Sequence, residues 1–225
     1  MSYFTSRSGL RTLSLTVLTG GALLAAVGAT TSALEARSRE AALTAENDAW
    51  LDKLTGKHRQ LFDAPAPNGG IPLVHMLNYY DTYNKAYGAP DREINAVGTF
   101  YGSTTFYGLN DAMWAKYRLG EFSETVDPKT GKPAVANPWR TEPVILGMSL
   151  PQASIESLQA RGATFIICNN AIGIFASMVG KARGVPAETV ADDFRANLLP
   201  GVVLVPGMVV AIEKAQARGI AYHRQ

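Results

Sequence analysis

The sequence contains one cysteine, three histidines and no cluster of basic residues. A single cysteine cannot close a disulfide within the chain, so Cys168 is a buried inert thiol, half of an intermolecular bridge, or a reactive thiol. No second histidine or cysteine stands at metal-ligand spacing from His75, which favours a structural role for that residue. We place His58 and His223 at strand ends near the surface, and we predict neither a metal site nor a cofactor.

An excess of charge of one sign is also missing. The chain has 21 lysines and arginines against 19 acidic residues, a formal net charge of +2. Proteins that bind nucleic acid neutralise phosphates with clustered basic side chains, so we predict no nucleic-acid partner. A phosphate-binding fingerprint and a Ser-His-Asp order are absent as well, which argues against nucleotide binding and serine hydrolase chemistry.

The N-terminal segment has the pattern of an export signal. Arg7 and Arg11 precede an apolar run over Leu13–Ala29, and small residues follow that run. A positive start, an apolar centre and a small-residue cleavage site are typical of secretory signal peptides. We therefore predict that residues 1–36 are removed and that the protein is periplasmic or secreted. The alternative is an uncleaved N-terminal segment that anchors the protein to the membrane.

Beyond the signal, apolar runs alternate with helical patterns. We expect residues 37–56 to form a helical spacer, or a helix packed outside the sheet, and residues 57–225 to form one domain. Strands are predicted at 58–63, 93–100, 164–167, 202–205 and 220–223, with helices at 71–87, 110–117, 151–160, 168–183, 187–197 and 208–218. Such alternation predicts an α/β three-layer sandwich with a mainly parallel sheet of four to five strands. We interpret the "VVLV" run at 202–205 as a buried strand, and the proline-rich residues 119–143 as a long surface insertion.

Loops that follow parallel strands meet at one edge of a sheet, where ligands bind. Cys168 comes at the end of a predicted strand and the start of a helix, where amides and the helix dipole favour a thiolate. The candidate ligand-binding residues lie in the four loops that we expect at this edge: Asp63, Asn68, Gly69, Tyr101, Ser103, Thr104, Asn169, Asn170, Pro206 and Gly207.

Two of these candidates also have simpler interpretations. The amides of Asn169 and Asn170 could orient an anion or a persulfide, but ordinary capping of the following helix explains them as well and is favoured. Asp63 could act as an acid or base beside the thiol, or could cap the loop at 65–70 in an Asx-type turn.

The C-terminal third of the chain resembles the DsrE/DsrF (YchN-like) family. The resemblance is carried by Leu158–Gly162, by "TFIICNNA" at 164–171 and by "LLPGVVLVPGMVVAIEKAQARGIAY" at 198–222. It covers residues 57–223 and is sharp from residue 155 onward. It implies a small α/β domain, a homo-oligomer that is a trimer or higher, and a persulfide carried on the strand-end cysteine, a place that Cys168 occupies. The chain departs from the small cytoplasmic members in its export signal, its 119–143 insertion and its aromatic loop at 101–107.

Three classes of function remain open. The chain could be a thiol-based sulfur carrier or sulfurtransferase-like protein that uses Cys168 and a sulfur donor. It could instead be an exported module that binds a small ligand without turnover, or a structural subunit of an assembly. We expect the first, with the non-catalytic binding or assembly role as the alternative, and contact with the membrane only if the N-terminal segment is uncleaved.

Overall fold

Five parallel strands form the central sheet of the computed structural model, which describes residues 46–225. The strands are β1 (His58–Asp63), β2 (Ile94–Phe100), β5 (Thr164–Cys168), β6 (Val202–Val205) and β7 (Ala221–Arg224). Their order is β6-β5-β2-β1-β7, and every neighbouring pair is parallel. The predicted α/β class with a mainly parallel sheet is confirmed.

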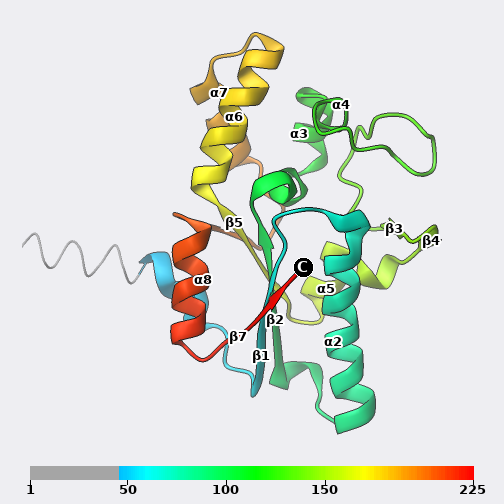
Figure 1. The fold of residues 1–225 in the computed structure, drawn as a ribbon, viewed down its shortest axis with the longest axis vertical. Helices are drawn as coiled ribbons and strands as arrows, with labels where there is room; N and C mark the ends of the chain where they lie inside the picture. The colour runs from blue at the N-terminus through cyan, green and yellow to red at the C-terminus, as the bar shows by residue number, and fades with distance from the viewer. Residues whose placement is uncertain (1–45) are drawn as a thin grey trace, which may run out of the picture. The chain divides into compact units, whose positions relative to one another are not determined.

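Helices cover both faces of this sheet, which makes three layers (Figure 1). Helices α2 (Ile71–Tyr87) and α5 (Ile155–Ala160) lie on one face, and α8 (Met208–Ala217) lies on the other. The first face holds the α2-side core, which includes Phe62, Leu73, Tyr80, Phe100, Phe165 and Ile172. The second holds the α8-side core, which includes Trp50, Leu61, Val97, Ile166, Cys168, Val205 and Ala211. Alternate residues of β1, β2 and β5 enter opposite cores, as the pleat requires.

The described part of the predicted spacer packs on the sheet. Residues 46–52 are helical, and Trp50, Leu51 and Leu54 are buried in the α8-side core. Ion pairs connect Asp48 to Lys214 at 2.6 Å and Asp52 to Arg218 at 2.9 Å, so this helix lies against α8. Of the two interpretations of residues 37–56, the packed helix describes residues 46–52. Residues 37–45 and the predicted signal at 1–36 lie outside the described residues.

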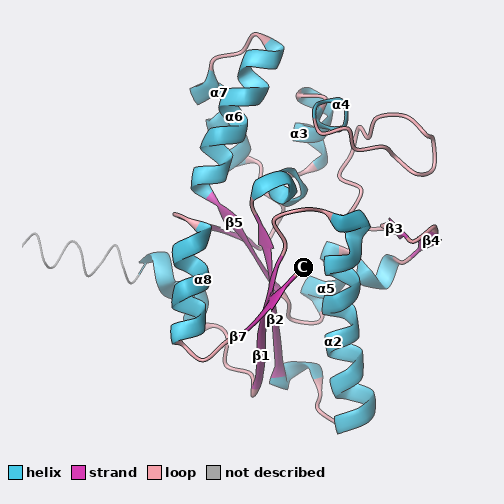
Figure 2. Cartoon of the chain, in the orientation of Figure 1, coloured by secondary structure: helices cyan, strands magenta, loops and turns pink. Residues whose placement is uncertain are grey.

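Two further helices extend past the carboxyl end of the sheet (Figures 1 and 2). They are α6 (Asn169–Arg183) and α7 (Ala187–Ala196), which are joined by a short turn. At Gly180 an added Cβ would come within 2.6 Å of the Val185 carbonyl oxygen, so only glycine fits this close approach of the two helices. None of the helices described within residues 46–225 is long and apolar enough to cross a membrane.

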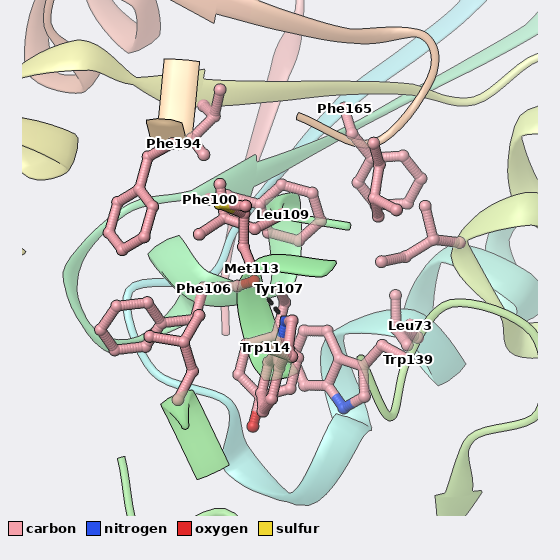
Figure 3. Close-up of a cluster of buried hydrophobic side chains, with 14 of the residues drawn as sticks. Leu73, Phe100, Phe106, Tyr107, Leu109, Met113, Trp114, Trp139, Phe165 and Phe194 are labelled. Carbon is pink, nitrogen blue, oxygen red and sulfur yellow. Dashed lines mark hydrogen bonds between the residues drawn. The ribbon is translucent and has the colours of Figure 1, made fainter. Parts of the chain in front are cut away.

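The 119–143 segment is only partly a surface insertion. Residues 128–133 are exposed, but Trp139 is buried and stacks on Tyr107, with 3.9 Å between the ring centroids (Figure 3). The buried Asn137 side chain donates hydrogen bonds to the carbonyls of Tyr107 and Leu109. These contacts fasten the segment to the α2-side core, and they correct the expectation of a surface loop at its C-terminal end. The remaining elements of this crossover are η3 (Gly102–Gly108), α3 (Asp111–Lys116), α4 (Leu119–Phe122), the hairpin β3 (Val144–Ile145) and β4 (Met148–Ser149), and η4 (Pro151–Ala153).

The interpretation of 202–205 as a buried strand is wrong. β6 lies at one edge of the sheet, and of its four residues only Val205 is buried. Three crossovers in succession each add a strand on the same side of β1, so β6 ends that progression with no neighbour beyond it among the described strands. β6 is apolar although only one of its faces is covered and it lies at the edge of the sheet. A short run of valines looks the same in the sequence whether the strand is central or at an edge.

Candidate functional site

The connections that follow the neighbouring strands β5 and β6 leave the sheet toward opposite faces. After β5 it continues into α6, whose Ile172 and Ala176 enter the α2-side core. After β6 it continues into α8, whose Ala211 and Ala215 enter the α8-side core. Adjacent parallel strands whose connections leave to opposite faces open a crevice at their carboxyl ends, and ligands bind there in open α/β sheets. Cys168 and Val205, which pair in register, end the two strands at this point.

The sulfur of Cys168 accepts hydrogen bonds from the first turns of two helices. The Ala171 N–H of α6 donates to Sγ at 3.4 Å, and the Met208 N–H of α8 donates at 3.3 Å. Helix N-termini carry a partial positive charge, so both helices stabilise negative charge on the sulfur. Burial opposes this effect, because Cys168 is only 6% exposed and Ile166, Val205 and Met208 belong to the same apolar cluster.

Four of the sequence candidates surround this thiol. Asn169 and Asn170 follow Cys168 directly, and Pro206 and Gly207 precede Met208. The two segments are close, since a Cβ added to Gly207 would lie 3.2 Å from Asn170 Nδ2. Asn170 and Pro206 are exposed and adjoin, in the chain, the two helix starts whose amides contact the buried sulfur.

Helix capping does not explain the two asparagines. Cys168 itself occupies the N-cap of α6 and accepts from the Ala171 amide. Asn169 instead accepts a hydrogen bond from Arg195 Nε at 3.0 Å, which ties the start of α6 to α7. The favoured capping interpretation is therefore wrong for both residues, and of the two only Asn170 is exposed beside the thiol.

A second polar group lies at the same end of the sheet, around Asp63. This carboxylate is 4% exposed, and its Oδ2 accepts a hydrogen bond from the Tyr222 hydroxyl at 2.5 Å. That hydrogen bond raises the pKa of Tyr222. Burial, followed by the nearby Asp63 carboxylate, raises the pKa of Tyr101. The carboxylate accepts hydrogen bonds from the hydroxyls of Thr99 and Tyr222, so it holds the edge strand β7 and does not cap the 65–70 loop.

Tyr101 lies between the two groups. In the parallel pairing of β2 and β5, Phe100 is opposite Ile167, so the next residues along are Tyr101 and Cys168. Tyr101 packs against the α8-side core that contains Cys168. Its hydroxyl is close enough to Asp63 for the carboxylate to raise the pKa of Tyr101, in addition to burial. Tyr101 therefore lies between the Asp63 carboxylate and the core that contains the Cys168 thiol.

The other four candidates stabilise or shape the loops that follow β1 and β2. Thr104 is fully buried, and its hydroxyl donates to the Ala64 carbonyl at 2.6 Å. The Ser103 hydroxyl donates to the Pro65 carbonyl at 3.2 Å. Asn68 and Gly69 have positive φ values of 44° and 61° in the turn that leads into α2. Ser103 and Thr104 join the loops after β1 and β2, and Asn68 and Gly69 shape a turn, so none of the four is brought to the sulfur by these contacts.

Sequence reasoning missed Tyr222 and the Met208 amide. Tyr222 is 159 positions from Asp63, and the two meet only because β7 returns to pair with β1. No local sequence pattern predicts such a long-range pairing. Pro206 and Gly207, which precede Met208, did predict a loop at the correct edge of the sheet. Comparison of the chain with protein-family models and with curated proteins gave no match.

Proposed function

We propose that the protein is an exported, DsrE-like sulfur carrier that holds sulfane sulfur on Cys168. The observation that carries the proposal is the pair of amide donors on Sγ, from Ala171 and Met208, at the point where β5 and β6 diverge. The resemblance of residues 155–223 to the DsrE/DsrF family supports it, as does the export pattern of residues 1–36. The protein acts in the periplasm or outside the cell.

The transfer step needs no external oxidant. The Cys168 thiolate attacks the terminal sulfur of a donor persulfide, R–S–SH. A new S–S bond forms to Cys168 as the S–S bond of the donor breaks, and the donor leaves as a thiolate that takes up a proton from water. The two helix N-termini stabilise the anionic sulfur before the attack. Asn170 and Pro206 are the exposed residues of the two segments that meet at the sulfur, and a small donor is expected to approach beside them.

Intact mass spectrometry of the native protein after exposure to inorganic polysulfide tests this function. We expect a gain of about 32 Da, one sulfur atom on a thiol, that a reducing thiol reverses. The Cys168→Ser variant is the control and should gain nothing. Labelling that occurs only after unfolding would show an inert core thiol and would overturn the proposal.

A non-catalytic role in assembly is the second candidate, and the surface around β6 favours it. Leu204 on this edge strand is 39% exposed, and Val209 and Val210 in the first turn of α8 are 74% and 48% exposed. Apolar side chains gathered at an open sheet edge are typical of subunit contacts. The oligomer of this proposal is a trimer or larger, and it is compatible with the sulfur-carrier role.

A further inference from the structure

A cleft lies between helix α2 and the edge strand β7, on the face of the sheet opposite the Cys168 sulfur. Its volume is about 220 Å³. Its wall contains Phe62 of the α2-side core, whereas Cys168 belongs to the α8-side core. The residues that line it come from β1, α2 and β7: Gln60, Phe62, His75, Asn78, Tyr79, Thr82, Tyr83 and His223. Carboxylates, lysines and arginines are absent from this lining, so the two imidazoles are its strongest ligands.

The two histidine rings face the cleft as neighbours. His75 lies on α2 and His223 on β7, and their ring centroids are 5.4 Å apart with an interplanar angle of 54°. A zinc-like ion held about 2.0–2.1 Å from one nitrogen of each ring, at a tetrahedral angle, places the ring centroids roughly 5 Å apart. No second histidine stands at ligand spacing from His75 in the sequence, but in the fold β7 pairs with β1 and puts His223 beside Phe62.

One ring is already oriented as a metal ligand requires. His75 Nδ1 lies 2.5 Å from Gln225 Oε1, so the ring donates its Nδ1 proton to the amide oxygen. That tautomer leaves the lone pair on Nε2. Metal-bound histidines are generally held in this way, with the second nitrogen hydrogen-bonded to an oxygen that sets the tautomer and the ring orientation.

We propose that His75 and His223 bind a divalent transition-metal ion of the zinc class in this cleft. Imidazole suits such ions, while the lack of carboxylates disfavours magnesium and calcium. Residues 46–225 contain no group of three or more histidine, cysteine, aspartate or glutamate side chains placed to hold a metal. The site is consequently a two-imidazole site, whose remaining coordination positions are filled by water or by a small ligand from solution. It is independent of the chemistry proposed for Cys168.

Calorimetric titration of the full chain with Zn²⁺ tests the site. The titration uses protein without a histidine tag and with the Cys168→Ser substitution, which removes the thiol as a competing ligand. We expect one ion per chain, and a loss of affinity of about 10-fold or more when either His75→Ala or His223→Ala is introduced. His58→Ala is the matched control, because His58 is the remaining histidine and stacks on Tyr83 of the same wall at 4.0 Å, yet does not line the cleft. Its affinity for Zn²⁺ should equal that of the parent.

Two further measurements separate ligation from a structural effect. Gln225→Ala leaves both imidazoles in place and should weaken Zn²⁺ binding by about 10-fold through loss of the ring's orientation. In NMR spectra, Zn²⁺ should shift the ring signals of His75 and His223 and leave those of His58 unchanged, while Mg²⁺ shifts none. Absence of Zn²⁺ binding at concentrations up to about 1 mM, or equal affinity in the parent and in both histidine variants, overturns the proposal.

Discussion

At the scale of single residues, the position of Cys168 has two consequences that act in opposite directions. Its sulfur receives two amide hydrogen bonds, from Ala171 and Met208, which stabilise an anion. Its burial at 6% exposure limits contact with reagents. The residue also has a structural function, because it supplies the N-cap acceptor for α6 in the place where serine, threonine or asparagine is usual.

Replacement of Cys168 by serine and by alanine separates the packing of this side chain from its hydrogen bonds. A serine oxygen can still accept from the Ala171 and Met208 amides, so we expect Cys168→Ser to lower the free energy of unfolding by about 1 kcal/mol. Cys168→Ala leaves both buried amides without an acceptor and should cost about 1–2 kcal/mol more than serine does. Urea unfolding of the three proteins measures this difference. Equal stability of the two variants would contradict a capping role for the sulfur.

At the scale of elements, Arg161 connects α2 to the turn between α5 and β5. Its guanidinium donates to both oxygens of Asp91, to Asp81 at 2.7 Å and to Asn84 at 2.7 Å. It also lies over the Tyr80 ring, 4.7 Å from the centroid. The hydrogen bonds from Arg161 lower the pKa of Asp91. The pKa of Asp81 is lowered as well, first by Lys85 and then by Arg161.

Arg161→Met should remove this connection while keeping an apolar stem over Tyr80. We expect a loss of about 1–2 kcal/mol near neutral pH, since the network is partly solvent-exposed and charge-assisted bonds there are weakened. A carboxyl whose folded pKa is lowered stabilises the fold above its unfolded pKa, near 3.8 for Asp91, and loses that contribution as the pH falls below it. The stability difference between parent and variant should therefore shrink below pH 3.8. Chemical unfolding at a series of pH values tests this, and a gap that widens in acid would show that the ion pairs are not its source.

The positions of the helices and strands along the chain were largely predictable from the sequence, whereas the pairing of the strands and the contacts between distant elements were not. The strand at 58–63 and the helix at 71–87 match β1 and α2 because breakers of glycine and proline bound both segments. The edge position of β6 and the return of β7 to β1 depend on contacts between distant segments, which carry no local pattern. For the same reason the sequence placed Cys168 at the correct strand end, but it could not reveal that Tyr222 reaches Asp63 or that His223 reaches His75.

At the scale of the whole molecule, the assembly that we propose uses the exposed apolar residues at the β6 edge. Among the strands of residues 46–225, β6 is the last on this side and has one edge without a partner strand. Val209 adjoins it at the start of α8 with 74% of its surface exposed. Burial of such a residue in a subunit contact contributes through the hydrophobic effect, about 25 cal/mol for each Å² removed from water. A charge placed there would have to be buried without a partner, and that strongly opposes association.

Val209→Asp should therefore dissociate the proposed oligomer while leaving the subunit folded. Because the side chain is exposed, we expect the free energy of unfolding of the isolated chain to change by less than about 0.5 kcal/mol. Val135→Asp is the matched control, since Val135 is 73% exposed but lies in the 119–143 segment away from the sheet edge. Light scattering at micromolar concentration should give the mass of a trimer or larger for the parent and for Val135→Asp, and a monomer mass for Val209→Asp. A parent protein that is itself monomeric, or a Val209→Asp protein that keeps the parent's mass, would show that this edge is not the subunit contact.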